Sequence, residues 1–148
     1  MNITTHFALI ELTRTGTGLP NSPGPAELAA LTALCSTLLA PLRARFGPVS
    51  IHSGYRSPAV NAKIGGSATS QHMRGEAADL HVAGVSLQVV FDWIRHSSGL
   101  PFGQVILEGH TPNAPSWIHL SLGEPWRPVA TCRQAMVFDG ARYRAAIG

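Results

Sequence analysis

Cysteine is scarce in this sequence, and the two residues present, Cys35 and Cys132, stand far apart. Two distant cysteines make no disulfide framework, and they lack the paired spacing of a structural zinc knuckle. Cys35 falls on the apolar side of an expected helix, where a buried free thiol is the usual outcome. The cysteines therefore predict neither a disulfide-stapled fold nor a cysteine-bound zinc.

Charged residues are also few, at 13% against 45% hydrophobic residues. This balance excludes a disordered chain and predicts a compact globule. The net charge is +3, and the arginines are scattered without a dense cluster, so we expect no nucleic-acid partner. Mild basicity suits an anionic polymer, although an ordinary basic protein has the same composition.

Targeting signals are missing as well. Residues 1–6 lack the charged start and apolar core of a signal peptide. No apolar run approaches the ~18 residues needed to span a membrane. We therefore expect a protein made in the cytoplasm without a signal peptide and without a membrane span. The length of 148 residues suits one domain, over residues 1–148, and we expect a monomer.

Hydrophobic periodicity predicts an α+β fold in which helices flank a small antiparallel sheet. One helix should begin after Gly24-Pro25 and end at Gly47-Pro48, since leucines recur between them at three- and four-residue steps. Pro41 should kink this helix. The remaining expectations are strands at 48–53, 75–82, 104–108 and 117–122, helices at 59–64 and 86–96, a loop at 109–116 edging a cleft, and a terminal hairpin at 133–138 and 141–144.

Three residues have the side chains of a catalytic zinc site. His72 and Asp79 stand seven residues apart, which is roughly 23 Å if the chain is extended. The chain must therefore reverse between them if both bind one ion, and Gly75 is where it can. His119 alternates with Ile118 and Leu120, so on a strand it points away from the buried face. Two histidines and one carboxylate leave the fourth zinc position for water.

A carboxylate near such a site is needed to take a proton from water and pass it to the leaving amine. Glu108 is the best candidate, because it ends a strand just before the loop that leads to His119. Glu76 lies three residues before Asp79 and faces the opposite side of an extended strand. With seven histidines in the chain, some pairing of histidine and aspartate also arises by chance, so the surrounding residues decide how specific the pattern is.

Read with their surroundings, these residues resemble the M15 D-alanyl-D-alanine peptidases. The segment Ser70-x-His72-x-x-Gly75-x-Ala77-x-Asp79, followed by Trp117-Ile118-His119, is similar to the zinc signature of that family. The upstream Ser53-Gly54-Tyr55-Arg56-Ser57-Pro58, with Asn61 and Gly65-Gly66-Ser67, continues the resemblance. It covers about residues 5–122 and is strongest to the short branch common in phages and prophages. It implies the zinc-site fold shared with hedgehog domains and vancomycin-resistance dipeptidases.

The resemblance implies one zinc ion per chain, bound by His72, Asp79 and His119. It implies that Arg56 holds the substrate carbonyl or the developing oxyanion, a task that suits a permanently charged fork of donors; a structural salt bridge is the alternative. Glu108 would be the catalytic base. Here the sequence departs from the better-known members, in which the acid lies close to the last histidine, because Glu108 is eleven residues back.

Four further residues are candidates for substrate binding or for supporting the ligands. Ser70 either bonds a ligand or the substrate, or makes a turn. His81 shares a strand face with Asp79 and either orients that carboxylate or is structural. Trp117 lines the cleft or packs in the core. Tyr55, beside Arg56, completes the group. His6, His52, His96 and His110 have no partner visible in the sequence.

The resemblance implies a zinc peptidase that hydrolyses an amide in a peptidoglycan stem peptide or cross-link, as a D-Ala-D-Ala carboxypeptidase or endopeptidase. Without a signal peptide, a phage or prophage lysin that reaches the cell wall after release is the expected biology. Two alternatives stay open. One is a catalytically inert, zinc-containing binding module, and the other is a cytoplasmic D-Ala-D-Ala dipeptidase.

Overall fold

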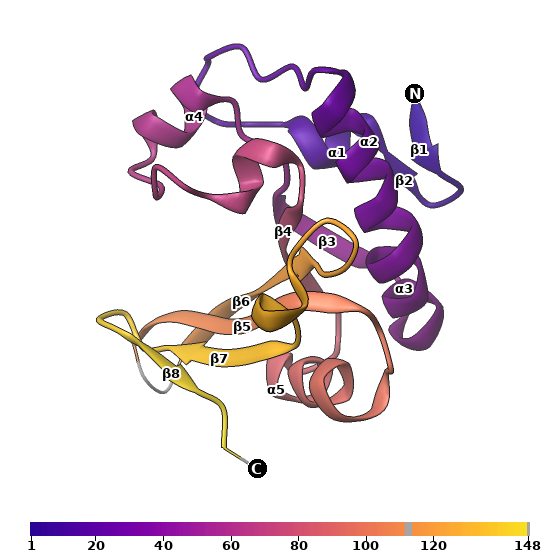
Figure 1. Cartoon of the computed structure of the whole chain (residues 1–148), viewed down its shortest axis with the longest axis vertical. Helices are drawn as coiled ribbons and strands as arrows, with labels where there is room; N and C mark the ends of the chain where they lie inside the picture. The colour runs from indigo at the N-terminus through magenta and orange to yellow at the C-terminus, as the bar shows by residue number, and fades with distance from the viewer. Residues whose placement is uncertain (112–113, 148) are drawn as a thin grey trace.

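Six strands form one sheet, and helices cover one of its faces (Figure 1). The computed structural model describes residues 1–111 and 114–147. The strands of this sheet are β3 (Val49–Ser53), β4 (Ala77–Val82), β5 (Phe102–Thr111), β6 (Ala114–Leu122), β7 (Gln134–Phe138) and β8 (Tyr143–Ala145). Their order is β3-β4-β6-β5-β7-β8. The expected α+β class is confirmed, with a sheet larger than the sequence suggested.

One pair of strands departs from the expected antiparallel arrangement, because β7 runs parallel to β5. The end of β6 pairs with the beginning of β5, at Leu122 and Phe102. The chain therefore leaves β6 beside the start of β5. It returns through the 3-10 turn η4 (Val129–Thr131) and enters β7 from that same end of the sheet. The hairpin of β7 and β8 itself is antiparallel, as expected.

The long helix expected after Gly24-Pro25 consists of three consecutive segments. These are α2 (Pro25–Leu34), the π-helical turn η1 (Cys35–Leu39) and α3 (Ala40–Phe46). The π turn ends two residues before Pro41, the residue expected to kink the helix. Proline has no N–H to continue the regular ladder, and a wider turn is one way in which a helix accommodates that gap. Gly47, at φ +96°, ends the helix, as the sequence predicts.

This helix is the described segment that bears on the expected lack of a membrane span. Pro25–Phe46 is 22 residues long, and an 18-residue stretch of it has a mean hydropathy of 1.4, so this helix is long and apolar enough by composition to cross a membrane. Leu31, Leu38 and Leu42 on this helix are fully buried in the protein core. A core helix passes the same composition test, so the finding is weak evidence for a membrane span.

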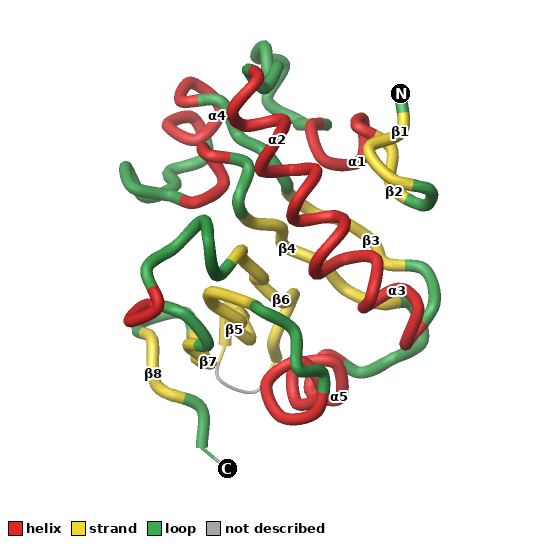
Figure 2. The backbone as a smooth tube through the Cα atoms, turned by 45° about the vertical axis from the view of Figure 1, so that its right-hand side comes forward, coloured by secondary structure: helices red, strands yellow, loops and turns green. Residues whose placement is uncertain are grey.

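The helix-covered face holds the hydrophobic core. Helix α5 (Leu87–Asp92), which continues as the π turn η3 (Trp93–Ser97), packs on β4, β5 and β6, while α3 packs on β3. Figure 2 shows the long helix and α5 over different parts of the sheet. The strands contribute Val49, Ile51, Ala78, Leu80, Val82, Val105, Leu107, Ile118, Leu120 and Leu122 to this core. Alternate residues of the same strands face the other way.

The remaining elements are β1 (Asn2–Thr4), β2 (Phe7–Ala8), α1 (Leu9–Thr13), α4 (Pro58–Lys63) and the 3-10 turn η2 (Gln71–Arg74). Of these, β1 packs on α2 and η1, α1 packs on β3, and η2 packs on β4 and α2. The loop expected at 109–116 is shorter than predicted, since β5 continues to Thr111 and β6 begins at Ala114. Between them, residues 112–113 lie outside the described part of the chain. The antiparallel β5–β6 pairing therefore runs farther than the Pro/Asn/Gly content of this stretch indicates.

Candidate metal centre and active site

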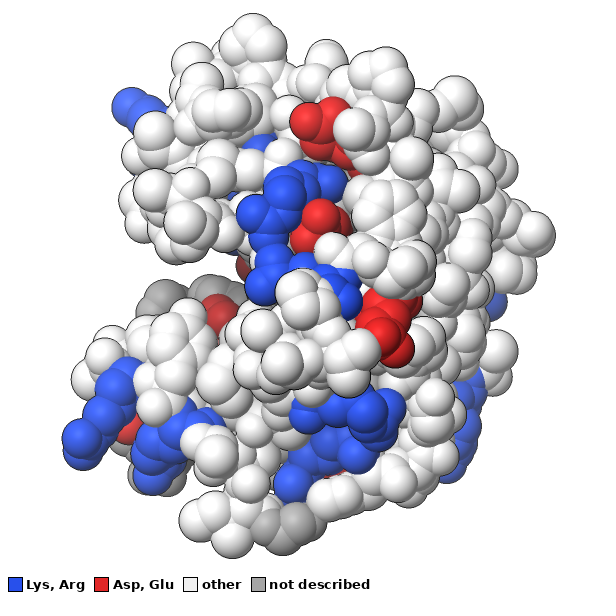
Figure 3. All heavy atoms as spheres, viewed as in Figure 1, with Lys and Arg blue, Asp and Glu red and all other residues white. Residues whose placement is uncertain are grey.

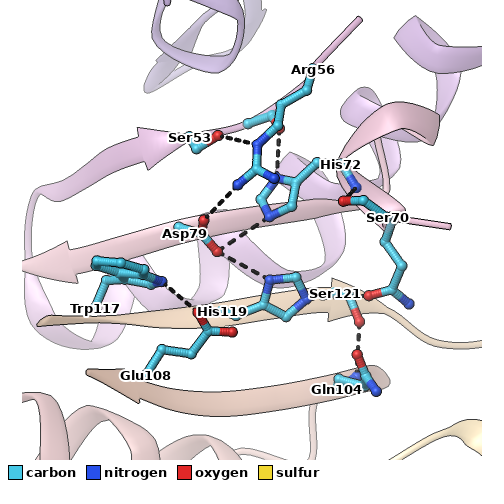
Figure 4. Close-up of polar contacts among 12 residues, drawn as sticks. Ser53, Arg56, Ser70, His72, Asp79, Gln104, Glu108, Trp117, His119 and Ser121 are labelled. Atoms are coloured by element: carbon cyan, nitrogen blue, oxygen red, sulfur yellow. Dashed lines mark hydrogen bonds and ion pairs between the residues drawn. The ribbon is translucent and has the colours of Figure 1, made fainter. Parts of the chain in front are cut away.

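Two of the three expected ligands are neighbours across adjacent strands. Asp79 of β4 pairs directly with His119 of β6, and both project from the face that the helices leave open (Figure 4). Opposed residues on antiparallel strands have Cβ atoms about 5 Å apart, which is a separation that one ion can bridge. The alternation of His119 with Ile118 and Leu120 gives the orientation that the sequence predicts: both apolar neighbours are fully buried.

The third side chain, His72, reaches this face from the 3-10 turn η2. Ser70 caps the turn, and its hydroxyl accepts a hydrogen bond from the His72 amide at 3.2 Å. Gly75 ends the turn in the left-handed conformation, at φ +72°, so the chain reverses where the sequence predicts. A Cβ at this position would collide with the Glu27 carbonyl oxygen of α2. Glycine is therefore required both by the backbone angle and by the close approach of the helix.

The three side chains converge closely enough to hold one metal ion. Their ligand atoms all lie within 4.8 Å of one another, and all three residues are buried. Asp79 Oδ1 lies 3.3 Å from His72 Nε2 and 3.1 Å from His119 Nδ1. Neutral imidazole and carboxylate are suitable zinc donors. The triplet thus has the composition of a three-ligand catalytic site.

Hydrogen bonds on the outer side of each ring support this interpretation. His72 Nδ1 lies 2.7 Å from the Gly54 carbonyl oxygen, and His119 Nε2 lies 3.2 Å from Gln71 Oε1. Oxygen atoms of these kinds only accept, so each ring donates outward. The inner nitrogen of each ring is then left with a lone pair facing the Asp79 carboxylate. A cation or added protons must offset this cluster of acceptors, and a zinc ion fits the donor set.

The Asp79 carboxylate divides its two oxygens between different partners. Oδ1 faces the histidines, whereas Oδ2 accepts a hydrogen bond from Arg56 Nη2 at 3.3 Å. Burial by itself raises the pKa of Asp79. When added protons and not a metal occupy the inner nitrogens of His72 and His119, the positive charge of these rings and their hydrogen bonds outweigh burial and lower the pKa of Asp79 below its usual range. Asp79 is therefore held as an anion, which is the form that binds metal.

Arg56 is fixed by three neighbours. Besides Asp79, its guanidinium donates to Ser53 Oγ at 3.0 Å and to Asn61 Oδ1 at 3.4 Å. A Cβ at Gly66 would collide with the Asn61 amide oxygen, so glycine at position 66 lets Asn61 reach Arg56. The salt bridge that the sequence left open as an alternative is therefore present, and Arg56 also lines the cleft described below.

Glu108 lies on β5, opposite Trp117 of β6. Its Oε2 accepts a hydrogen bond from Trp117 Nε1 at 3.0 Å, which orients the carboxylate beside Asp79 and His119 (Figure 4). Burial, and then the negative charge of Asp79, raise the pKa of Glu108. The eleven-residue gap to His119 is closed because the two strands form an antiparallel pair, which brings Glu108 close to it in space.

These groups line one cleft of about 650 Å³, a size typical of small-molecule sites. The 65–72 segment forms one wall, and β5 to β8 form the other; the hollow opens at the left in Figure 3, with basic side chains beside it. The residues that line the cleft include Arg56, Gly66, Ser70, Gln71, His72, Asp79, Glu108, Trp117 and His119. The Trp117 indole also lines an adjoining hollow of about 500 Å³.

Two of the supporting residues expected from the sequence lie elsewhere. Tyr55 is buried in the hydrophobic core and lines the adjoining hollow instead of the cleft. His81 contacts His52, with His52 Nε2 and His81 Nδ1 2.6 Å apart, and no hydrogen bond among the described residues joins His81 to Asp79. His52 has no visible partner in the sequence because this pairing arises across β3 and β4.

Gln71 is a site residue that the sequence reasoning missed. It is 7% exposed, and its amide oxygen fixes the orientation of His119. The signal was present, since Gln71 directly precedes His72 and follows Ser70. Its role became visible only when β6 brought His119 beside η2.

Comparison with known proteins agrees with this geometry. A family model described as Peptidase M15 matches residues 6–121, which is more than half of the chain and spans all three converging side chains. No curated protein matches the sequence. The matched segment runs from just before β2 to the last residue but one of β6. The His-Asp-His triplet within it is the donor set of a zinc enzyme. The chain therefore belongs to the M15 peptidase family and is a metallopeptidase.

Proposed function

We propose that this metallopeptidase acts as a monomer and hydrolyses an amide bond in a peptidoglycan stem peptide or cross-link. His72, Asp79 and His119 would hold one zinc ion, Glu108 would be the catalytic base and Arg56 would stabilise the oxyanion. The observation that carries the proposal is the convergence of all five side chains on a single cleft. The M15 match supports the class of substrate.

Zinc, when bound, supplies Lewis acidity, which polarises a carbonyl group and makes water more acidic. His72 and His119 are prepared for this task, because Gly54 and Gln71 fix the outer nitrogen of each ring. Asp79 contributes a full negative charge through Oδ1. Its other oxygen stays bound to Arg56, so the carboxylate keeps a fixed orientation.

Glu108 would take a proton from the attacking water and deliver it to the leaving amine. Its raised pKa suits the second half of this cycle, because a less acidic carboxylic acid holds the proton until the amine accepts it. The hydrogen bond from Trp117 Nε1 occupies only Oε2. The other oxygen, Oε1, is then the atom that exchanges the proton.

Arg56 would bind the substrate carbonyl oxygen as negative charge develops on it. A guanidinium has five N–H donors, and three are directed at Ser53, Asn61 and Asp79. The remaining donors belong to a group held rigidly at the cleft, so little reorganisation is needed during the reaction.

The test is hydrolysis of defined muropeptides by the zinc-loaded protein, with products identified by mass spectrometry. Glu108→Gln should lower kcat by about 10²- to 10⁴-fold while the zinc content stays at one per chain. Glu124→Gln, the same substitution at an exposed glutamate, is a matched control that leaves Glu108 in place. Unchanged hydrolysis by Glu108→Gln would remove Glu108 from the mechanism. Zinc-loaded protein without any hydrolysis would favour the inert binding module.

The biological setting that we propose is a phage or prophage lysin acting on the cell wall. Supplying intact sacculi and free D-alanyl-D-alanine together separates this from a cytoplasmic dipeptidase. A lysin should solubilise sacculi in the presence of excess dipeptide. Preferential consumption of the dipeptide, with sacculi intact, would favour the dipeptidase instead.

A further inference from the structure

A second row of side chains crosses the open face of the sheet, beside the row that holds the metal ligands. Asp79 of β4 pairs with His119 of β6. Two residues farther along the same ladder, and therefore on the same face, lie His81 of β4 and Trp117 of β6. Trp117 pairs in turn with Glu108 of β5. The second row thus runs from His81, through Trp117, to the proposed catalytic base.

His52 joins this row from β3, the edge strand of the sheet, because the strand contains a bulge. The β3–β4 pairing shifts its register between Ile51 and Ser53, which makes His52 the extra residue. Bulges re-aim side chains and are frequent next to active sites. The centroid of the His52 ring lies 4.8 Å from that of His81 and 6.4 Å from that of Trp117. His52 therefore reaches over β4 to a tryptophan on β6.

The His52 ring is held on one side and packs on the other. His52 is an exposed residue, yet its Nε2 lies 2.6 Å from His81 Nδ1, and this hydrogen bond restricts rotation of the ring. On the other side, the His52 and Trp117 rings are tilted by 38°. Their 6.4 Å separation is within the 4.5–7 Å typical of stabilising aromatic pairs. The Trp117 indole therefore packs against an imidazole that is itself fixed.

The orientation of the indole matters because Trp117 orients Glu108. Trp117 Nε1 donates to Glu108 Oε2 at 3.0 Å (Figure 4). Rotation of the indole about its side-chain bonds would break this hydrogen bond and release the carboxylate from its position beside the ligands. Misplacement of a reacting group by about 1 Å can cost two orders of magnitude in rate. Contacts that fix the indole therefore also fix the proposed base.

We propose that His52, held by His81, is a positioning residue that acts through Trp117 and keeps Glu108 directed at the metal centre. This inference rests on the proposed function, in which Glu108 is the base, and it assigns a role to two histidines outside the ligand set. The contacts run across four adjacent strands, β3, β4, β6 and β5. Loss of His52 should then lower the turnover rate and leave the metal bound.

A double-mutant cycle on the zinc-loaded protein tests this role. An aromatic pair contributes a factor of about 2 to 10, so His52→Ala should lower kcat by about 2- to 10-fold with KM and zinc content unchanged. His52→Phe keeps a ring against Trp117 and should recover most of the loss. In a Trp117→Phe background, which lacks the indole donor, His52→Ala should have no further effect. Additive losses, or a raised KM at unchanged kcat, would overturn the role. His6→Ala, at another exposed histidine, is the control.

An NMR measurement separates this inference from the proposed function, because it needs no turnover. The indole N–H signal of Trp117, assigned by its loss in Trp117→Phe, should shift in Glu108→Gln and also in His52→Ala, but not in His6→Ala. A shift in His52→Ala without hydrolysis by the wild type would retain the positioning role and reject the peptidase activity. Hydrolysis by the wild type with an unshifted signal in His52→Ala would do the reverse. Thermal unfolding of each variant excludes misfolding as the cause.

Discussion

The two faces of the sheet are made by the same strands and have opposite properties. On β4, Ala78 and Leu80 point into the helix-covered core and are fully buried. Their neighbour Asp79 points the other way, into the cleft. On β6, Ile118 and Leu120 alternate with His119 in the same manner. A shift of the register by one residue would exchange the two faces, so core packing also fixes the site.

The two faces contribute to the free energy of folding with opposite sign. Apolar burial on the helix face contributes roughly 25 cal/mol for each Å² removed from water. The open face instead gathers a buried aspartate, two buried histidines and a glutamate whose pKa is raised by burial. Such groups are costly unless they are paired. The helix face therefore supplies the stability with which the chain holds its chemical groups together.

The largest expected effect comes from removing a side chain of the open face. His119→Ala should abolish zinc binding and reduce peptidase activity to background. A metal that binds only the folded state stabilises it by about 2.7 kcal/mol at one hundred times its Kd, and the variant should lose this gain. Thermal unfolding with and without zinc measures it. His96→Ala, at an exposed histidine, is the control, and a zinc-dependent shift that survives in His119→Ala would contradict the ligand assignment.

The adjacent residue should respond in the opposite way. Ile118→Ala removes a fully buried side chain from the helix face and should cost about 2–5 kcal/mol in the free energy of unfolding. The zinc stoichiometry of the folded protein should stay at one, because His119 keeps its orientation. Urea unfolding and metal analysis of the same sample test both statements. Loss of zinc at full stability would break the separation of the two faces.

A smaller effect, on metal affinity alone, is expected from Gln71, which orients the ligand His119 without binding the metal itself. Gln71→Met removes the amide oxygen that orients His119 while keeping a similar side-chain volume. Loss of such a supporting hydrogen bond costs about 10- to 100-fold in metal affinity. Competition with a chelator of known affinity measures the change. Gln88→Met, on the exposed side of α5, is the control, and equal zinc affinity in both variants would show that His119 is oriented by other contacts.

The smallest effect concerns the stability of the zinc-free protein. Glu108 has a raised pKa in the folded chain, against an ordinary value of 4.5, so the folded state resists its ionisation. Glu108→Gln should match the wild type most closely at low pH and become relatively more stable as the pH rises from about 4.5 through the folded-state pKa. Urea unfolding across this range, in the presence of a chelator, measures the difference. A difference that shrinks with rising pH would contradict the shift.

Local pattern was enough to predict part of this site. His119 was oriented correctly because alternation along a strand is a local property, and the reversal at Gly75 followed from the need to bring His72 and Asp79 together. Contacts that depend on strand order could not be predicted in the same way. The pairing of His52 with His81 needs the β3–β4 register.

The cleft wall formed by Arg127 and Tyr143 depends on β7 joining the sheet beside β5 in parallel. The sequence signals of a terminal hairpin do not say which strand it will pair with. Tyr55 shows that a motif can also predict a role that the fold does not give. Its position beside Arg56 in the motif predicts a place in the cleft, whereas packing places its ring in the core.

Gly75 links the long helix to the chemistry of the cleft. A Cβ at this position would collide with the Glu27 carbonyl oxygen. The turn that carries His72 therefore packs directly against the backbone of α2, which fixes the position of the turn. Substitutions in the first turn of α2 that displace the Glu27 carbonyl should therefore shift the His72 turn. They should lower the affinity for zinc before they unfold the protein. A peptidase with this arrangement can lose its activity through its scaffold while every residue that touches the substrate is intact.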